Sequence, residues 1–132
     1  MTHNHKKVSV ETSYSPEIKN LTLTLKDAQP QDNTFYLQVL CLLGGFIRVT
    51  TRVEDGEIRT RDMSRKEFHL LQDGIRETID ATSKTKIISF GDAKMILLRS
   101  EGNPLGCAIG NNKYVIDETD VERLREFCAK LM

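Results

Sequence analysis

The sequence has no tryptophan, few aromatic residues and no excess of charge of either sign. Phe and Tyr make up 6% of the 132 residues, and nineteen Lys and Arg balance nineteen Asp and Glu. A net charge of zero argues against a strongly basic nucleic-acid-binding protein, because the affinity of such proteins comes largely from neutralising phosphates. Any basic binding surface must therefore be local.

Long apolar segments and a signal sequence are also missing. The longest apolar stretch, LQVLCLLGGF, is too short and too interrupted to span a bilayer. No apolar segment of the kind found in secretory signals follows the first residues. We therefore expect an intracellular protein, cytoplasmic or in the nucleoid or nucleus, that does not contact a membrane.

Cysteines and recognisable catalytic motifs are scarce. Cys41, Cys107 and Cys128 form an odd set without C-x-x-C spacing, which is typical of reduced thiols in an intracellular protein. All three lie in apolar segments, where cysteine behaves as a small buried hydrophobe. No glycine-rich phosphate-binding motif is present. We predict that the protein is not an enzyme and has no cofactor and no metal site.

The distribution of apolar residues predicts strands on both sides of a central helix. Alternation is rough in residues 7–14 and clear in residues 20–27, and residues 34–43 are apolar on both faces, which predicts a covered central strand. Ser64 and Glu67 form a capping box, and the helix that follows has the apolar stripe Phe68, Leu71, Ile75 and Ile79. Short strands are predicted in residues 87–90, 94–100, 105–110 and 113–117. A second helix is predicted from about Asp120, with the apolar stripe Val121, Leu124, Phe127, Cys128 and Leu131.

The segment GGFIRVTTRVEDGEIRTRDMS, residues 44–64, predicts a β-hairpin with an unusual cluster of arginines. Asp55-Gly56 is typical of a two-residue type I′ turn. That turn would place Arg52 opposite Arg59. Arg48, Arg52, Arg59 and Arg61 would then share one face, and Val49, Val53 and Ile58 the other. Leu37, Val39 and Cys41 would share the arginine face if Gly44-Gly45 forms the preceding turn. Two readings are open: an anion-binding surface, or a solvated face that Glu54 and Glu57 partly neutralise.

An internal repeat is predicted by sliding the sequence against itself by 56 residues. This offset aligns Leu40 with Ile96 and Leu71 with Phe127, as predicted core positions, and it aligns the Asp55-Gly56 turn with Asn111-Asn112. We therefore predict an α+β protein of two tandem ββββα repeats, with antiparallel curved sheets and helices packed on their inner faces. Residues 1–16 would be a flexible or weakly structured N-terminal segment, 17–82 the first repeat and 83–132 the second. Because each repeat is too small to hold a core alone, the two should pack as one domain.

Two ββββα units in tandem resemble the Pur-alpha repeat proteins, the Whirly proteins and a family of single-stranded-DNA-binding transcriptional coactivators. The local resemblance lies in FYLQVLCLLGGFIRVT, residues 35–50, where an aromatic-led strand turns at glycine into a strand carrying a basic residue. The resemblance implies a curved sheet that binds single-stranded nucleic acid with basic and aromatic side chains. The residues that match this role are Arg48, Arg52, Arg59, Arg61, Phe35 and Tyr36.

The second repeat departs from this pattern. Pro104, Ala108, Val115 and Asp117 occupy the positions that correspond to the four arginines. Its face is therefore not basic, and we expect it to build a homodimer or an inter-repeat surface. The sequence thus predicts a non-enzymatic module that binds single-stranded DNA or RNA. The alternative is a protein-interaction module, such as an adaptor, a secretion chaperone or a pleckstrin-homology-like domain, which zero net charge allows equally well.

Overall fold

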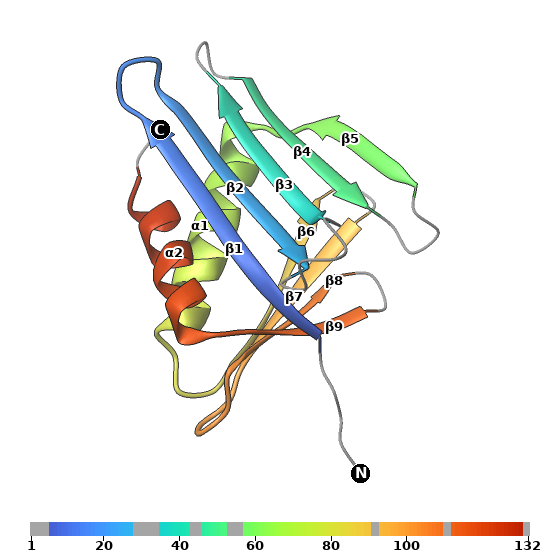
Figure 1. The fold of residues 1–132 in the computed structure, drawn as a ribbon, viewed down its shortest axis with the longest axis vertical. Coiled ribbons are helices and arrows are strands. Elements are labelled where there is room, and N and C mark those ends of the chain that lie inside the picture. Colours follow the sequence, from blue (N-terminus) through green and yellow to red (C-terminus); the bar gives the residue numbers. More distant parts are fainter. Residues whose placement is uncertain are drawn as a thin grey trace.

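The protein is an α+β structure in which one curled sheet surrounds two helices (Figure 1). The computed structural model describes residues 6–27, 35–42, 46–52, 57–90, 93–109 and 112–130. Five strands come first: β1 (Lys6–Ser15), β2 (Asn20–Asp27), β3 (Phe35–Leu42), β4 (Phe46–Arg52) and β5 (Ile58–Asp62). Helix α1 (Arg65–Ile79) is followed by β6 (Lys84–Phe90), β7 (Ala93–Arg99), β8 (Leu105–Ile109), β9 (Asn112–Ile116) and helix α2 (Glu118–Ala129).

The sheet consists of two antiparallel meanders that meet at one short parallel contact. The strand order is β5-β4-β3-β2-β1-β9-β8-β7-β6. β1 and β9 are the only parallel neighbours among the described strands, and they pair only at Lys6 and Lys7. We call β1–β5 the first meander and β6–β9 the second meander.

The helices connect the two meanders on the inner side of the curled sheet (Figure 1). Helix α1 follows the first meander in sequence but packs on β6 and β7 of the second, whereas α2 follows the second and packs on β1 and β2 of the first. The helices also contact each other. Because each helix packs across onto the other meander, the two halves share one core.

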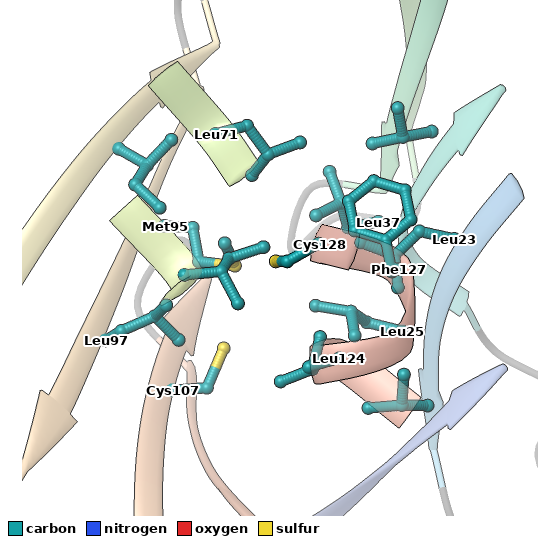
Figure 2. Close-up of a cluster of buried hydrophobic side chains, with 14 of the residues drawn as sticks. Leu23, Leu25, Leu37, Leu71, Met95, Leu97, Cys107, Leu124, Phe127 and Cys128 are labelled. Atoms are coloured by element: carbon teal, nitrogen blue, oxygen red, sulfur yellow. The ribbon is translucent and has the colours of Figure 1, made fainter. Parts of the chain in front are cut away.

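The core is formed by alternate residues of the strands and by the apolar stripes of both helices. Figure 2 shows Leu23, Leu25 and Leu37 of the first meander facing Met95, Leu97 and Cys107 of the second, with the two helices between them. Phe127 of α2 is fully buried and packs edge-to-face on Phe68 of α1, with 5.7 Å between ring centroids. The predicted helix stripes are confirmed as buried, except for Leu131, which lies outside the described residues.

The three cysteines are buried in this core. Burial raises the pKa of the Cys107 and Cys128 thiols to about 12 each. It also raises the pKa of Cys41, an effect that nearby Arg65 partly opposes. The Cys128 thiol donates a hydrogen bond to the Gln72 carbonyl oxygen at 3.4 Å. The predicted burial of Cys128 is confirmed.

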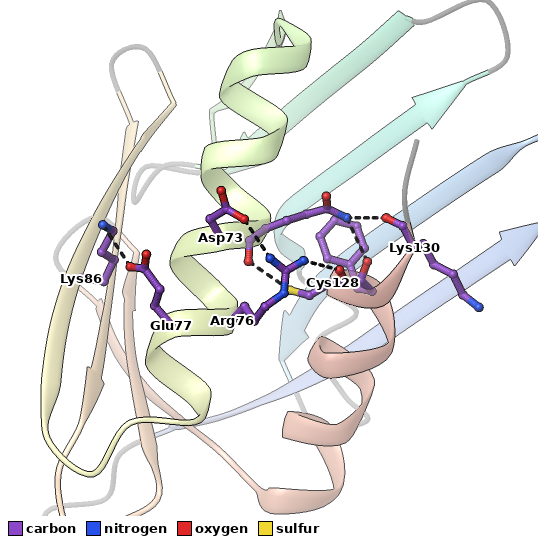
Figure 3. A network of polar contacts seen from close by, with 8 residues as sticks. Asp73, Arg76, Glu77, Lys86, Cys128 and Lys130 are labelled. Carbon is purple, nitrogen blue, oxygen red and sulfur yellow. Dashed lines mark hydrogen bonds and ion pairs between the residues drawn. The ribbon is translucent and has the colours of Figure 1, made fainter.

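Side chains at the helix ends fix the two helices. Ser64 and Glu67 form the predicted capping box, and the hydrogen bonds to Ser64 lower the pKa of Glu67. The C-terminus of α2 lies beside the middle of α1, and there Gln72 Nε2 donates to the carbonyl oxygens of Phe127 and Lys130 at 3.1 and 2.9 Å. Arg76 donates to the Cys128 carbonyl oxygen at 2.6 Å (Figure 3). These contacts satisfy C-terminal carbonyls of α2 that have no partner within the helix.

Two predictions about the strands are wrong. Residues 6–15 form a strand in the middle of the sheet, with Val8 and Val10 buried, rather than a flexible or weakly structured segment. Leu40 and Ile96 lie on the outer side and not in the core: Leu40 is half-buried and Ile96 is 36% exposed. Strand β3 is therefore buried on its inner side only, although Leu40 and Leu42 on its outer side are apolar as well.

The strand pairings and helix N-caps of the two halves also do not follow the predicted offset of 56 residues. It would map the pair Val39 and Val49 onto Met95 and Leu105, but Met95 pairs with Ile109. It would place the second N-cap at Asp120, whereas the N-caps are Ser64 and Asp117. A shift of three residues is close to one helical turn, so the apolar stripes of the helices still match at the wrong offset.

In the part of the chain that the structure describes, no helix has the length and apolar character needed to cross a membrane.

Candidate nucleic-acid interface

The predicted four-arginine face does not form, because the β4–β5 hairpin has a different register. Arg52 pairs with Ile58 and Thr51 pairs with Arg59. The connection is therefore residues 53–57 rather than a two-residue turn; residues 53–56, including Val53 and Glu54, lie outside the described part. A slip of one residue reverses the side on which each residue of β5 lies.

The four arginines are divided between the two sides of the sheet. Paired residues share a side, so Arg48 and Arg52 lie on the outer side, with Asp62 and Ile58. Arg59 and Arg61 lie on the side of the buried residues Thr51 and Val49, which is also the side of Leu37, Val39 and Cys41.

Arg59 and Arg61 have acidic neighbours at the margin of the inner side. Arg59 forms an ion pair with Glu57 at 3.3 Å, and Arg61 forms one with Glu67 of α1 at 3.5 Å. The Glu57 contact supports the reading of a solvated face that acidic residues partly neutralise, but only for Arg59. We therefore remove Arg59 and Arg61 from the candidate interface.

Arg48 and Arg52 belong to an outer surface rich in hydroxyl groups. We call this surface, on the outer side of β1–β5, the polar face; its members are Ser9, Glu11, Ser13, Thr22, Thr24, Lys26, Gln38, Phe46, Arg48, Thr50, Arg52, Thr60 and Asp62. The apolar side chains Leu40, Leu42 and Ile58 lie on the same side of the sheet.

Hydrogen bonds between neighbouring strands order the polar side chains of this face. Gln38 Nε2 donates to Thr24 Oγ1 at 3.4 Å, and the Thr50 and Thr60 hydroxyls lie 3.2 Å apart. These pairs are neutral and exposed or half-buried, so they present donors and acceptors without adding charge.

The polar face carries a small excess of positive charge. Lys26 forms an ion pair with Glu11, and Arg48 Nε lies 3.9 Å from an Asp62 carboxylate oxygen. The Arg48 and Asp62 side chains are 55% and 82% exposed, and ion pairs this exposed contribute little to stability. An anionic ligand can therefore replace Asp62 at small cost.

Phe46 is the residue of this surface that sequence reasoning missed. Its exposed fraction of 69% is the highest among the large apolar side chains of the described residues. It lies two positions before Arg48 on the same strand, and therefore on the same side. The period-two pattern Phe46-Arg48 after Gly44-Gly45 is visible in the sequence and could have indicated it.

The other two predicted aromatic residues cannot be placed on a face. Phe35 and Tyr36 belong to β3, where a β-bulge interrupts the pairing with β2. Their side chains lie outside the described part of the structure. Among the side chains that are described, no cluster of His, Cys, Asp and Glu could hold a metal ion.

The corresponding outer surface of the second meander has an apolar centre. We call this centre the apolar face; its members are Ile87, Ile96, Leu98, Gly106, Ala108 and Val115. Thr85, Ser89, Lys94 and Lys113 lie on the same side of the sheet, around it. Ile87, Ile96 and Leu98 are 59%, 36% and 48% exposed. Ala108 and Val115, two of the positions predicted to replace the arginines, lie on this side, but Lys94 and Lys113 lie there as well.

No protein-family model matches the chain, and neither the curated proteins nor the solved structures contain a match.

Proposed function

We propose that the protein is a non-enzymatic module that binds single-stranded nucleic acid on the polar face. The observation that carries this proposal is the alignment of an exposed aromatic ring and two arginines, Phe46, Arg48 and Arg52, along the outer side of one strand. Aromatic rings stack on bases of any sequence, while arginines neutralise phosphates and stack on bases themselves. The flanking threonine hydroxyls supply hydrogen-bond partners for sugar and phosphate oxygens.

The order of elements supports the wider architecture on which this proposal draws. We infer that β2–β5 with α1 and β6–β9 with α2 are two ββββα repeats, and that β1 is an addition to the first. The helices support this because Phe68, Leu71 and Ile75 hold the same places after Ser64 as Val121, Leu124 and Cys128 hold after Asp117. The resemblance to Pur-alpha and Whirly proteins is proposed on the same ground.

Fluorescence anisotropy with a labelled single-stranded DNA oligonucleotide, over a range of salt concentrations, tests the function. Replacing Arg48 and Arg52 by Gln should weaken binding and make the slope of log K against log salt shallower by about 1.4, since two phosphate contacts are lost. Phe46→Ala should cost about 1–3 kcal/mol of binding free energy through lost stacking.

The chain supplies a matched control in the same hairpin. Arg59→Gln with Arg61→Gln removes the same charge from the opposite side of the sheet. This variant should keep most of the affinity of the native protein. Equal losses in both double variants would show that binding follows net charge and not the polar face, and absence of binding at low salt would reject the proposal.

The apolar face favours a second function, that of a protein-interaction module. Exposed apolar patches bordered by polar residues are typical of protein-binding sites. At low protein concentration, the dye 8-anilinonaphthalene-1-sulfonate should bind the native chain. It should bind less to a variant carrying Ile96→Lys and Leu98→Lys. Equal dye binding by both proteins would reject the apolar face as an accessible binding surface.

A further inference from the structure

Large and small side chains lie next to each other at two levels of the apolar face. Leu98 of β7 pairs with Gly106 of β8, and Ile96 pairs with Ala108. On both levels the large residue belongs to β7 and the small one to β8. The result is a ridge along β7 beside a groove along β8.

The groove has a volume of about 440 Å³ and is mostly apolar. Ile96 and Leu98 form one wall, Gly106 and Ala108 its floor, and Val115 part of the other wall. Lys113 is the one charged side chain among the described residues that line it. A partner for this surface must therefore bring apolar side chains at the spacing of alternate strand residues.

We propose that a second copy of this chain occupies the groove, through a twofold axis that runs parallel to the strands between β7 and β8. A twofold interface requires that one surface patch contain both complementary shapes. The axis places Leu98 of each copy over Gly106 of the other, and Ile96 over Ala108. Opposed sheets lie about 10 Å apart, and a large side chain facing a small one fills that space.

The lysines on this side weaken the association without preventing it. Lys94, two positions before Ile96, is exposed on the same side of β7, and the axis brings the two Lys94 residues closer together than the two Lys113 residues. The dimer should therefore become tighter as the salt concentration rises. The axis places the Lys113 residues of the two copies at opposite margins, separated by three strand spacings, or about 14 Å. This separation exceeds the Debye length of about 10 Å at 0.1 M salt, so their repulsion is screened. Ile87 of each copy then covers the aliphatic part of Lys113 of the other.

The inference rests on the second candidate function, and it names the partner. The face of four short strands is small compared with the area that a permanent dimer buries, so we expect a reversible dimer. Nucleic-acid binding by the polar face does not depend on it, because the two faces belong to different meanders.

Analytical ultracentrifugation of the full chain over a wide range of protein concentration tests the dimer. Ala108→Ile should fill the groove and Ile96→Ala should remove the ridge, and each should raise the dissociation constant at least about tenfold, since every change occurs twice in the dimer. The size swap, Ile96→Ala with Ala108→Ile, should restore association to within about threefold of the native value. Ile58→Ala, at an isoleucine on the outer side of the first meander that is more exposed than Ile96, should leave association unchanged.

Three results would overturn the proposal. They are a native protein that stays monomeric at all concentrations, a dimer unaffected by Ala108→Ile, and a size swap that associates more weakly than both single variants. Circular dichroism establishes whether each variant is folded. If Ala108→Ile unfolds the chain, Leu98→Lys serves instead, because Leu98 is half exposed; a folded Leu98→Lys variant that still dimerises would equally reject the interface. Dye binding by a native chain that stays monomeric at every concentration would reject self-association while leaving the interaction function standing.

Discussion

The two meanders are alike on their inner sides and unlike on their outer sides. Inside, both contribute leucine, isoleucine and one cysteine to a common core. Outside, the first carries mostly threonine, serine, arginine and lysine, with Phe46, Leu40, Leu42 and Ile58 among them. The second carries Ile87, Ile96 and Leu98 beside Gly106 and Ala108, with Lys94 and Lys113 around them. The inner side is fixed by the need to pack on the two helices. The outer side is free of that constraint, so the difference there is the best guide to function.

The largest effect on stability is expected from removing the ring of Phe127, which packs between the two helices. Phe127→Ala should lower the free energy of unfolding by about 3–5 kcal/mol, because Phe127 is fully buried between the helices. Since the meanders share one core, both should unfold in the same transition, as followed by circular dichroism in urea. Phe46→Ala, a control on the exposed outer side, should change stability by no more than about 0.5 kcal/mol. Separate transitions for the two halves would contradict the shared core.

The buried thiols of Cys107 and Cys128 should make the stability of the protein depend on pH. Cys107 of the second meander and Cys128 of α2 have pKa values raised to about 12 by burial, from 9.0. A raised pKa means that the unfolded chain loses these protons first. The stability that the buried neutral thiols provide is thus intact below pH 9 and is lost as pH rises from 9 towards 12. A variant with Cys107→Ala and Cys128→Ala should lose stability less steeply over this range in urea titrations. An equally steep fall would show that other groups are responsible.

The smallest effect is expected when the outer surfaces are made alike. Replacing Ile87 and Leu98 by threonine gives the second meander the hydroxyl character of the first. Because both side chains are about half exposed, stability should change by no more than about 1 kcal/mol, while dimerisation should be lost. Leu97→Thr, one position away but on the inner side, should cost several times more. A large loss from the outer substitutions would mean that the apolar face is part of the folding core.

Much of the local structure could be predicted from the sequence because it depends on local patterns. The alternation in residues 20–27 gives β2, the capping box at Ser64 gives the start of α1, and the short apolar segments after residue 84 give four strands. The helix stripes follow from their period, and all of their described members are buried. An α+β fold without a long apolar helix follows from these elements together.

The features that could not be predicted depend on register and on long-range packing. Asp55-Gly56 suggested a two-residue turn, but the longer connection moves Arg59 and Arg61 to the other side of the sheet. Ile96 and Leu40 are as apolar as core residues, and only the pairing of the strands shows that they face outward. The pattern of β1 is weak because polar residues follow Val8 and Val10 along the strand.

The most direct test of the central claim, that the two outer faces have different roles, is NMR titration of the native chain with a single-stranded oligonucleotide at low salt. The account predicts that amide shifts concentrate in β2–β5, around Phe46, Arg48 and Thr50, and that β6–β9 change little. Shifts centred on Ile96, Leu98 and Ala108, or no shifts at all, would contradict it.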